Sequence, residues 1–307
     1  MILRPRLNWW RMLLVWRGSI LKRIAPQLLF VAALSALVVR FHGELLHWKV
    51  TLTAVPFSLV GVALAIFLGF RNSASYDRYW EARRLWGRLL TDSRTLTRQA
   101  LTFVAGADRD PDLVRPFVLG LAAFVHAVRH RLRGSPARAD LQRLLPAEVL
   151  AQVGDARHPP MQILLWLAHW LRQQRESGRL DPLLAVEMDR GLTGLNDALG
   201  GCERIAHTPL PFTYSVILHR TVYLYCMMLP FGLLDAIGVM TPLMVTFVAY
   251  TFFSVEALGE EIEEPFGLEP NDLALDAMAI GIEISVRELL GDVDLPVAPV
   301  PVDFILT

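Results

Sequence analysis

The chain has 307 residues, of which 53% are hydrophobic, and its 30 basic and 30 acidic residues give a formal net charge of zero. A balanced charge argues against a nucleic-acid partner, and the two cysteines, Cys202 and Cys226, give no basis for a disulfide framework. The mean hydropathy is +0.39 although 20% of the residues are charged, so the apolar residues must be gathered in blocks. The composition therefore predicts a membrane protein with a large water-exposed part.

The N-terminal segment, residues 1–23, predicts an interfacial helix on the cytoplasmic side of the membrane. It is rich in arginine, contains no acid, and carries tryptophans that suit a membrane surface, namely Trp9, Trp10 and Trp16. An uncharged run begins at Ile24, and we expect the first transmembrane helix at 24–41. No small-x-small cleavage site follows this run, which predicts an uncleaved span rather than a signal peptide.

The second predicted transmembrane helix, residues 50–70, is 21 consecutive uncharged residues, enough to cross a hydrocarbon core of about 30 Å. It carries two stripes at i+4 spacing. One stripe is bulky and consists of Val62, Ile66 and Phe70. The other is small and consists of Gly61, Ala65, Gly69 and Ser73. A helix of this kind can pack closely on a copy of itself while presenting large side chains to an axis, although the same pattern also occurs in helices that only pack in a bundle.

Residues 71–210 predict a helical cytosolic domain between two pairs of spans. No proline occurs from 57 to 110, so we expect the second span to continue as one long helix into this domain. Further helical patterns are present, without convincing alternating strands, at 112–133, 160–176 and 181–198.

The segment from Thr221 to Val255 contains a single charged residue, Asp235, and is too long for one crossing. It predicts a hairpin of two spans, 212–234 and 236–256, with its turn between Asp235 and Pro242. The C-terminal tail, 257–307, begins with glutamates and ends in a proline-rich extended segment.

Basic residues predict the orientation of the chain. Arginines are concentrated before the first span and after the second, whereas the two short connections hold only Arg40 and Lys49. Both termini and residues 71–210 are therefore expected in the cytoplasm.

Motifs of catalysis are missing: the sequence has no nucleophile elbow, phosphate loop, dinucleotide fingerprint or zinc-protease helix, so an enzyme is not expected. His126 and His130 are spaced to share a metal, but they lie among arginines without a carboxylate nearby in the sequence, and a helix face at a subunit contact is the favoured interpretation. The glutamates at 260–264 fit either calcium or pairing with the arginines of 71–98.

Three stretches of the sequence resemble the bestrophin family, including its bacterial branch. They are Phe57 to Glu81, with Gly-Phe-Arg-Asn-Ser-Ala-Ser-Tyr-Asp-Arg-Tyr-Trp-Glu at its end, then Pro209-Leu-Pro-Phe-Thr-Tyr, then Glu263-Glu-Pro-Phe-Gly. The resemblance implies an all-α homopentamer with four transmembrane helices per subunit around one axial pore, in the inner membrane of a bacterial cell. It implies permeant ions and no cofactor, with lipid and other copies of the chain as the partners.

The family's apolar neck corresponds here to Val62, Ile66 and Phe70, the bulky stripe already found. Its cytosolic aperture, one aliphatic residue shortly before the third span, corresponds to Leu180, or to Leu183 if the register slips.

Animal members follow Pro-Phe-Gly with a run of aspartates that binds calcium, whereas this chain offers only the scattered candidates Glu263, Glu264 and Asp272. Similarity to the bacterial branch predicts a channel for monovalent cations such as sodium. The alternatives are a chloride channel of the same fold, a secondary transporter, which would be expected to have broken helices, and a membrane-tethered enzyme or scaffold.

Overall fold

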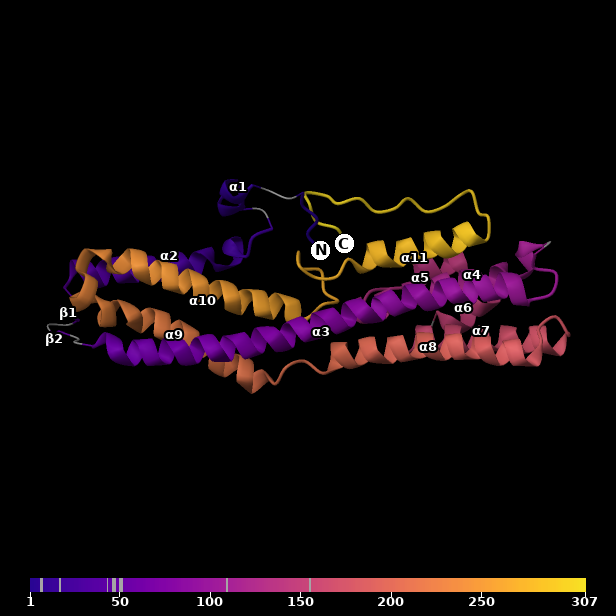
Figure 1. The fold of residues 1–307 in the computed structure, drawn as a ribbon, viewed down its shortest axis with the longest axis horizontal. Coiled ribbons are helices and arrows are strands. Elements are labelled where there is room, and N and C mark those ends of the chain that lie inside the picture. The colour runs from indigo at the N-terminus through magenta and orange to yellow at the C-terminus, as the bar shows by residue number, and fades with distance from the viewer. Residues whose placement is uncertain are drawn as a thin grey trace. The chain divides into compact units, whose positions relative to one another are not determined.

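The computed structural model describes residues 1–5, 8–16, 18–42, 44–45, 48–49, 52–108, 110–154 and 156–307 (Figure 1). It is built almost wholly of α-helices, as the sequence predicts, and divides into two compact units. The first, here called the apolar unit, comprises residues 4–79 and 209–264. The second, the hydrophilic unit, comprises residues 1–3, 80–208 and 265–307.

The apolar unit contains the expected spans. Its elements are α1 (Trp9–Leu13), α2 (Leu21–Arg40), the two-residue antiparallel strands β1 (Glu44–Leu45) and β2 (Trp48–Lys49), the first part of α3 (Ala54–Phe103), α9 (Phe212–Ile237), the 3-10 turn η2 (Gly238–Met240) and α10 (Thr241–Glu263). The strands were not predicted, and residues 50 and 51 of the expected second span lie outside the described residues.

Helix α3 is 50 residues long and begins in the apolar unit and ends in the hydrophilic unit (Figure 1). The predicted continuation of the second span into one long helix is therefore confirmed. Its cause is the absence of proline between Pro56, which lies in the first turn of the helix, and Pro111.

Three stretches of described helix are apolar and long enough to cross a membrane: Leu21–Arg40, Ala54–Phe103 and Phe212–Glu263. The last stretch includes both α9 and α10, which η2 separates and which pack against each other. The break falls inside the predicted turn, and Gly238 supplies a positive φ of 54° there, a conformation that residues with a Cβ rarely adopt. A hairpin is thus present.

The core of the apolar unit joins four helices. Buried side chains from α2, α3, α9 and α10 meet in one cluster, which includes Val31, Leu68, Val222, Val245 and Cys226. Helix α2 packs most extensively on α10, and α9 contacts both. Cys226, a free thiol, fills space in this core.

The hydrophilic unit is built around the buried helix α4. Its elements, besides the second part of α3, are the 3-10 turn η1 (Pro111–Leu113), α4 (Arg115–Arg133), α5 (Arg138–Leu144), α6 (Ala147–Val153), α7 (Pro159–Glu176), α8 (Pro182–His207) and α11 (Leu275–Leu289). Helix α4 is buried along most of its length and packs on α5, α7, α8 and α11. The predicted patterns correspond to α4, α7 and α8.

The C-terminal segment does not extend away from the fold. Residues 265–307 belong to the hydrophilic unit, where α11 packs on α4 and residues 293–301 have no regular secondary structure. The two chain ends are hydrogen-bonded to each other, because the Leu306 amide donates to the Met1 carbonyl at 2.9 Å and the Leu3 amide donates to Phe304 at the same distance (Figure 1).

Candidate ion-conduction pathway

The bulky stripe of α3 faces away from the core of its own protomer. Val62, Ile66 and Phe70 are 60%, 53% and 64% exposed, although all three are large and apolar. On the opposite face of the same helix, Leu64 and Leu68 are buried in the four-helix core. This stripe is therefore free to meet another molecule, an axis or lipid.

Polar contacts fix the axial position and the rotation of α3 relative to α9 and α10. The Tyr214 hydroxyl of α9 donates to the Phe67 carbonyl at 3.0 Å, and the Asn72 amide donates to the Val255 carbonyl of α10 at 3.2 Å. Gly259 permits the second contact, since a Cβ there would lie 2.2 Å from Asn72 Oδ1. These bonds lie beside the stripe and hold its side chains toward the open face.

The small stripe has two different surroundings. An added Cβ on Gly61 would lie 2.8 Å from the Tyr225 hydroxyl oxygen, so Gly61 serves the packing of α9 on α3 inside the protomer. Gly69 would meet nothing within 4 Å, and Ala65 and Ser73 are exposed. Only this second part of the stripe is available for close contact with another helix.

The two aperture candidates differ sharply in exposure. Leu180 is 1% exposed, and its backbone amide donates to the Gln174 carbonyl, whereas Leu183 is 81% exposed. Asp181 caps α8 by accepting a hydrogen bond from the Leu183 amide at 2.8 Å, which places Leu183 in the first turn of a well-defined helix. The sequence favoured Leu180; its burial inside the protomer leaves Leu183 as the residue that can face an axis.

A layer of charged groups follows the bulky stripe. Arg71 is buried and lies 3.3 Å from Glu263 Oε2, while Glu263 Oε1 accepts a hydrogen bond from the Leu210 amide. The guanidinium of Arg78 donates to the Glu263 carbonyl at 3.1 Å. The predicted pairing of the glutamate run with the arginines after the second span is confirmed at these residues.

The calcium candidates do not form one site. Glu263 is already occupied by Arg71, Glu264 is exposed, and Asp272, which lies in the other unit, accepts a hydrogen bond from the Glu269 amide at 2.7 Å. Within the described residues no group of three or more His, Cys, Asp or Glu side chains is arranged to hold a metal ion.

The histidines of α4 have carboxylate partners that the sequence did not reveal. His126 is 1% exposed, and its Nε2 lies 2.8 Å from Glu283 Oε2 of α11; His130 Nε2 lies 2.9 Å from Asp140 Oδ2 of α5. The interpretation of His126 as part of a subunit contact is therefore wrong, since it is buried inside the protomer. Glu283 is 157 positions from His126 along the chain, and Asp140 is ten positions from His130 and lies on the next helix, so folding brings both acids to the histidines.

Arginines complete this network and keep the Glu283 carboxylate ionised. Burial by itself raises the pKa of Glu283, but hydrogen bonds from Arg143 and His126 outweigh it and hold that pKa at about 2. Arg143 Nη2 donates to Glu283 Oε2 at 2.8 Å, and Arg287 donates to Oε1 at 3.2 Å. The cluster ties α4, α5 and α11 together and offers no free acceptor pair to a metal.

Comparison with known proteins identifies the family to which the chain is similar. The sequence model described as "Bacterial/Fungal Bestrophin protein" matches residues 1–288. The voltage-dependent anion channel-forming protein of Ralstonia nicotianae is 50% identical over 96% of both chains, and its namesake in Escherichia coli is 42% identical over 98% of both. A crystal structure of a bacterial bestrophin homologue from Klebsiella pneumoniae has 43% identity and a TM-score of 0.84, and the match covers 88% of this chain and all of that one.

The fold and these relatives define a channel-forming membrane protein rather than an enzyme. The chain belongs to the bacterial and fungal bestrophin family. The resemblance seen in the sequence is thereby confirmed.

The sequence reasoning did not single out two charged residues, Glu283 and Arg220. Glu283 is an acid at a buried position of the apolar α11 pattern, and such a lone buried acid signals a partnered charge. Arg220 lies within the predicted third span, and a single arginine in an otherwise apolar span is itself a signal.

Proposed function

We propose that the protein is a passive ion channel whose pore is lined by α3 from several copies of the chain. The observation that carries this proposal is the contrast on one helix: Val62, Ile66 and Phe70 are exposed while Leu64 and Leu68 are buried. Rings of apolar side chains impede ions by excluding water, so such a neck would both restrict and gate conduction.

The assembly proposed is a homopentamer, as the family resemblance implies. Ala65, Gly69 and Ser73 lie beside the bulky stripe and, being small, allow neighbouring α3 helices to approach closely. Each subunit crosses the membrane four times through α2, α3, α9 and α10, with the hairpin at η2 outside and both termini in the cytoplasm, and the membrane is the bacterial inner membrane. The excess of arginine beside the inner ends of these helices supports that orientation.

Leu183 is proposed as the cytosolic aperture in place of Leu180. A side chain that forms a ring around an axis must be exposed in the isolated protomer, which Leu183 is and Leu180 is not. A single aliphatic ring would discriminate ions mainly by size.

The two alternative functions, a secondary transporter and a scaffold, predict different features of the membrane helices. A secondary transporter of the broken-helix type would interrupt spans at Gly or Pro near the midplane, yet Pro26 and Pro230 lie inside continuous helices. A scaffold would leave the α3 stripe without a role. In liposomes, passive flux that does not saturate supports the channel, coupled flux supports a transporter, and no flux supports a scaffold.

The permeant ion is proposed to be either a monovalent cation or chloride. The resemblance to the bacterial branch predicts monovalent cations such as sodium, whereas the names of the Ralstonia and Escherichia relatives specify anions and favour chloride. The proposed neck carries no charge and selects neither sign. Reversal potentials of the purified protein in planar bilayers under a sodium chloride gradient decide the question, because they move toward the equilibrium potential of the ion that permeates.

A further inference from the structure

Arg220 is an exposed cation on a helix that we propose to span the membrane. It lies on α9, eight residues from Phe212, or about 12 Å from that end of the helix at 1.5 Å per residue. Among the described residues Arg220 has no hydrogen-bond or ion-pair partner. An arginine at such a depth is costly unless an anion neutralises it.

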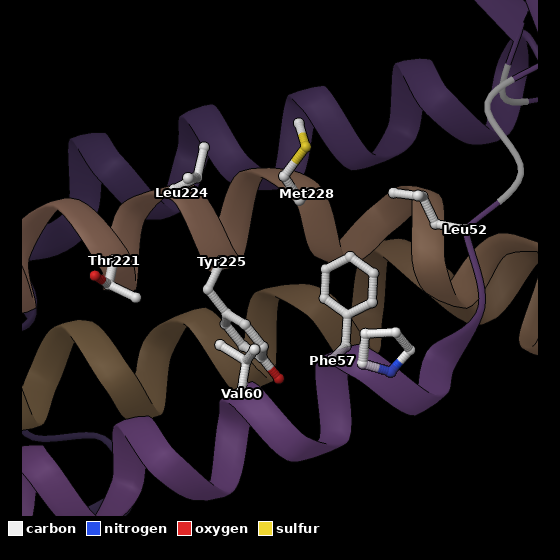
Figure 2. A pocket seen from close by; sticks show the side chains of 8 residues that line it. Leu52, Phe57, Val60, Thr221, Leu224, Tyr225 and Met228 are labelled. Carbon is white, nitrogen blue, oxygen red and sulfur yellow. The ribbon is translucent and has the colours of Figure 1, made fainter.

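An apolar groove begins one helical turn from Arg220. Leu224 and Met228, at i+4 and i+8, lie on the same face of α9, and both line a cavity of about 280 Å³ between α9 and the start of α3. Figure 2 shows Phe57 and Val60 projecting from α3 on the other side of the groove. The remaining lining residues are Leu52, Pro56, Thr221 and Tyr225.

The shape of the groove follows from how α3 and α9 pack. Gly232 lets Phe57 approach α9, since an added Cβ on Gly232 would lie 2.4 Å from the Phe57 ring. The Phe57 and Tyr225 rings lie 6.0 Å apart, tilted by 56°, and form the floor between the two helices. The wall is almost entirely apolar, which suits a hydrocarbon chain.

We propose that this groove and Arg220 form a binding site for an anionic phospholipid, with an acyl chain along the groove and the phosphate on the guanidinium. The proposal rests on the membrane orientation given above, in which Phe212 is at the cytoplasmic end of α9. Side chains of a helix tilt toward its N-terminus, so Arg220 reaches back toward the cytoplasmic headgroups while Leu224 and Met228 stay in the hydrocarbon. Arginine binds phosphate oxygens in a bidentate geometry.

Charge complementarity favours a lipid over a second copy of the chain. The predicted membrane segments 24–41, 50–70, 212–234 and 236–256 contain one acid, Glu256, and Asp235 in the turn between the last two lies about 22 Å farther along α9 than Arg220. Glu256, the last residue of the predicted fourth span, is buried, and its Oε1 lies 2.7 Å from Nδ1 of His219 in the same chain. A neighbouring subunit thus has no uncommitted carboxylate to offer at the depth of Arg220.

The test is lipid binding to the purified full-length protein in detergent, measured by native mass spectrometry with phosphatidylglycerol and phosphatidylcholine. The wild type should bind phosphatidylglycerol more tightly, and Arg220→Gln should weaken that binding about fivefold while changing phosphatidylcholine little. Arg98→Gln removes the same charge from an exposed position of the hydrophilic unit and should leave both affinities unchanged. Equal losses in both variants would contradict the proposal, as would no loss in Arg220→Gln.

A second experiment tests whether the groove holds an acyl chain, by filling the groove with a larger side chain. Leu224→Trp should weaken binding of both lipids, whereas Leu243→Trp, at an exposed position of α10 outside the groove, should not. If Leu224→Cys and Ala65→Cys together form crosslinked dimers that neither single variant forms, a neighbouring subunit covers the groove and the lipid site is refuted. Conductance of Arg220→Gln in bilayers separates this result from the channel proposal, which stands if the variant conducts.

Discussion

The Arg71 guanidinium lies 3.3 Å from Glu263 Oε2, and this buried ion pair joins α3, one residue beyond Phe70, to the last residue of α10. The side chains are 6% and 12% exposed, so neither charge can turn to water if its partner is removed. The rotation of the bulky stripe thus depends on a charge pair just beyond the stripe itself.

Breaking this pair should destabilise the protein strongly. Arg71→Ala should cost about 3 kcal/mol of unfolding free energy, because it leaves the Glu263 carboxylate buried without its cation. The matched control is Arg23→Ala, whose pair with Glu260 is 2.7 Å long but 44% and 59% exposed and should contribute under about 1 kcal/mol. Denaturation of the purified protein in detergent measures both, and equal effects would contradict the assignment.

Acidification should destabilise the hydrophilic unit through Glu283. Its pKa falls from 4.5 to about 2 on folding, so its contribution is present above pH 4.5 and is lost as the pH falls toward 2. That contribution is at most about 3 kcal/mol, and the solvent around Arg143, which is 42% exposed, reduces it.

Denaturation curves at a series of pH values provide the measurement. Glu283→Gln should lower stability at neutral pH and flatten the loss between pH 4.5 and 2. Glu148→Gln, at an exposed position of α6, should follow the wild type. A wild-type slope that survives in Glu283→Gln would show that other groups dominate.

The two aperture candidates predict opposite phenotypes. Leu183→Ala should let larger ions pass with little change in stability, because an exposed side chain leaves no cavity when it is removed. Leu180→Ala should instead cost about 2–5 kcal/mol, as for other buried leucines. Permeability ratios and thermal unfolding of both variants are the measurements. If Leu180→Ala widens the pore and unfolds like the wild type, the assignment reverses.

Assembly should depend on Gly69 more than the fold does. A larger side chain fits the isolated protomer there, so Gly69→Leu should fold but fail to pack on a neighbouring α3. Ala33→Leu places the same bulk on an exposed position of α2 and should assemble normally. Light scattering of the purified variants gives the subunit number, and a Gly69→Leu pentamer would remove this residue from the interface.

The sequence predicted features that are encoded locally. Uncharged runs located α2, α9 and α10, the absence of proline set the length of α3, and the i+4 stripes separated Val62 from Leu64. Each follows from residues within a few turns of one another.

Features that depend on distant residues could not be predicted in this way. Glu283 reaches His126 across 157 positions of the chain, and the burial of Leu180 depends on the packing of the hydrophilic unit rather than on its neighbours in sequence. The end of α7 and the cap of α8 place Leu180 inward and Leu183 outward, a distinction that no local pattern records.

The most direct test of the proposed pore is single-channel conductance in planar bilayers after the bulky stripe is replaced by alanine. With Val62, Ile66 and Phe70 all changed to alanine, the neck widens and admits water, so conductance or open probability should rise. The matched control changes three exposed apolar residues of α2 to alanine, namely Leu29, Phe30 and Leu37, and should leave the currents as they are. Unchanged currents in an intact assembly of the α3 variant would contradict the proposal and show that the stripe only packs.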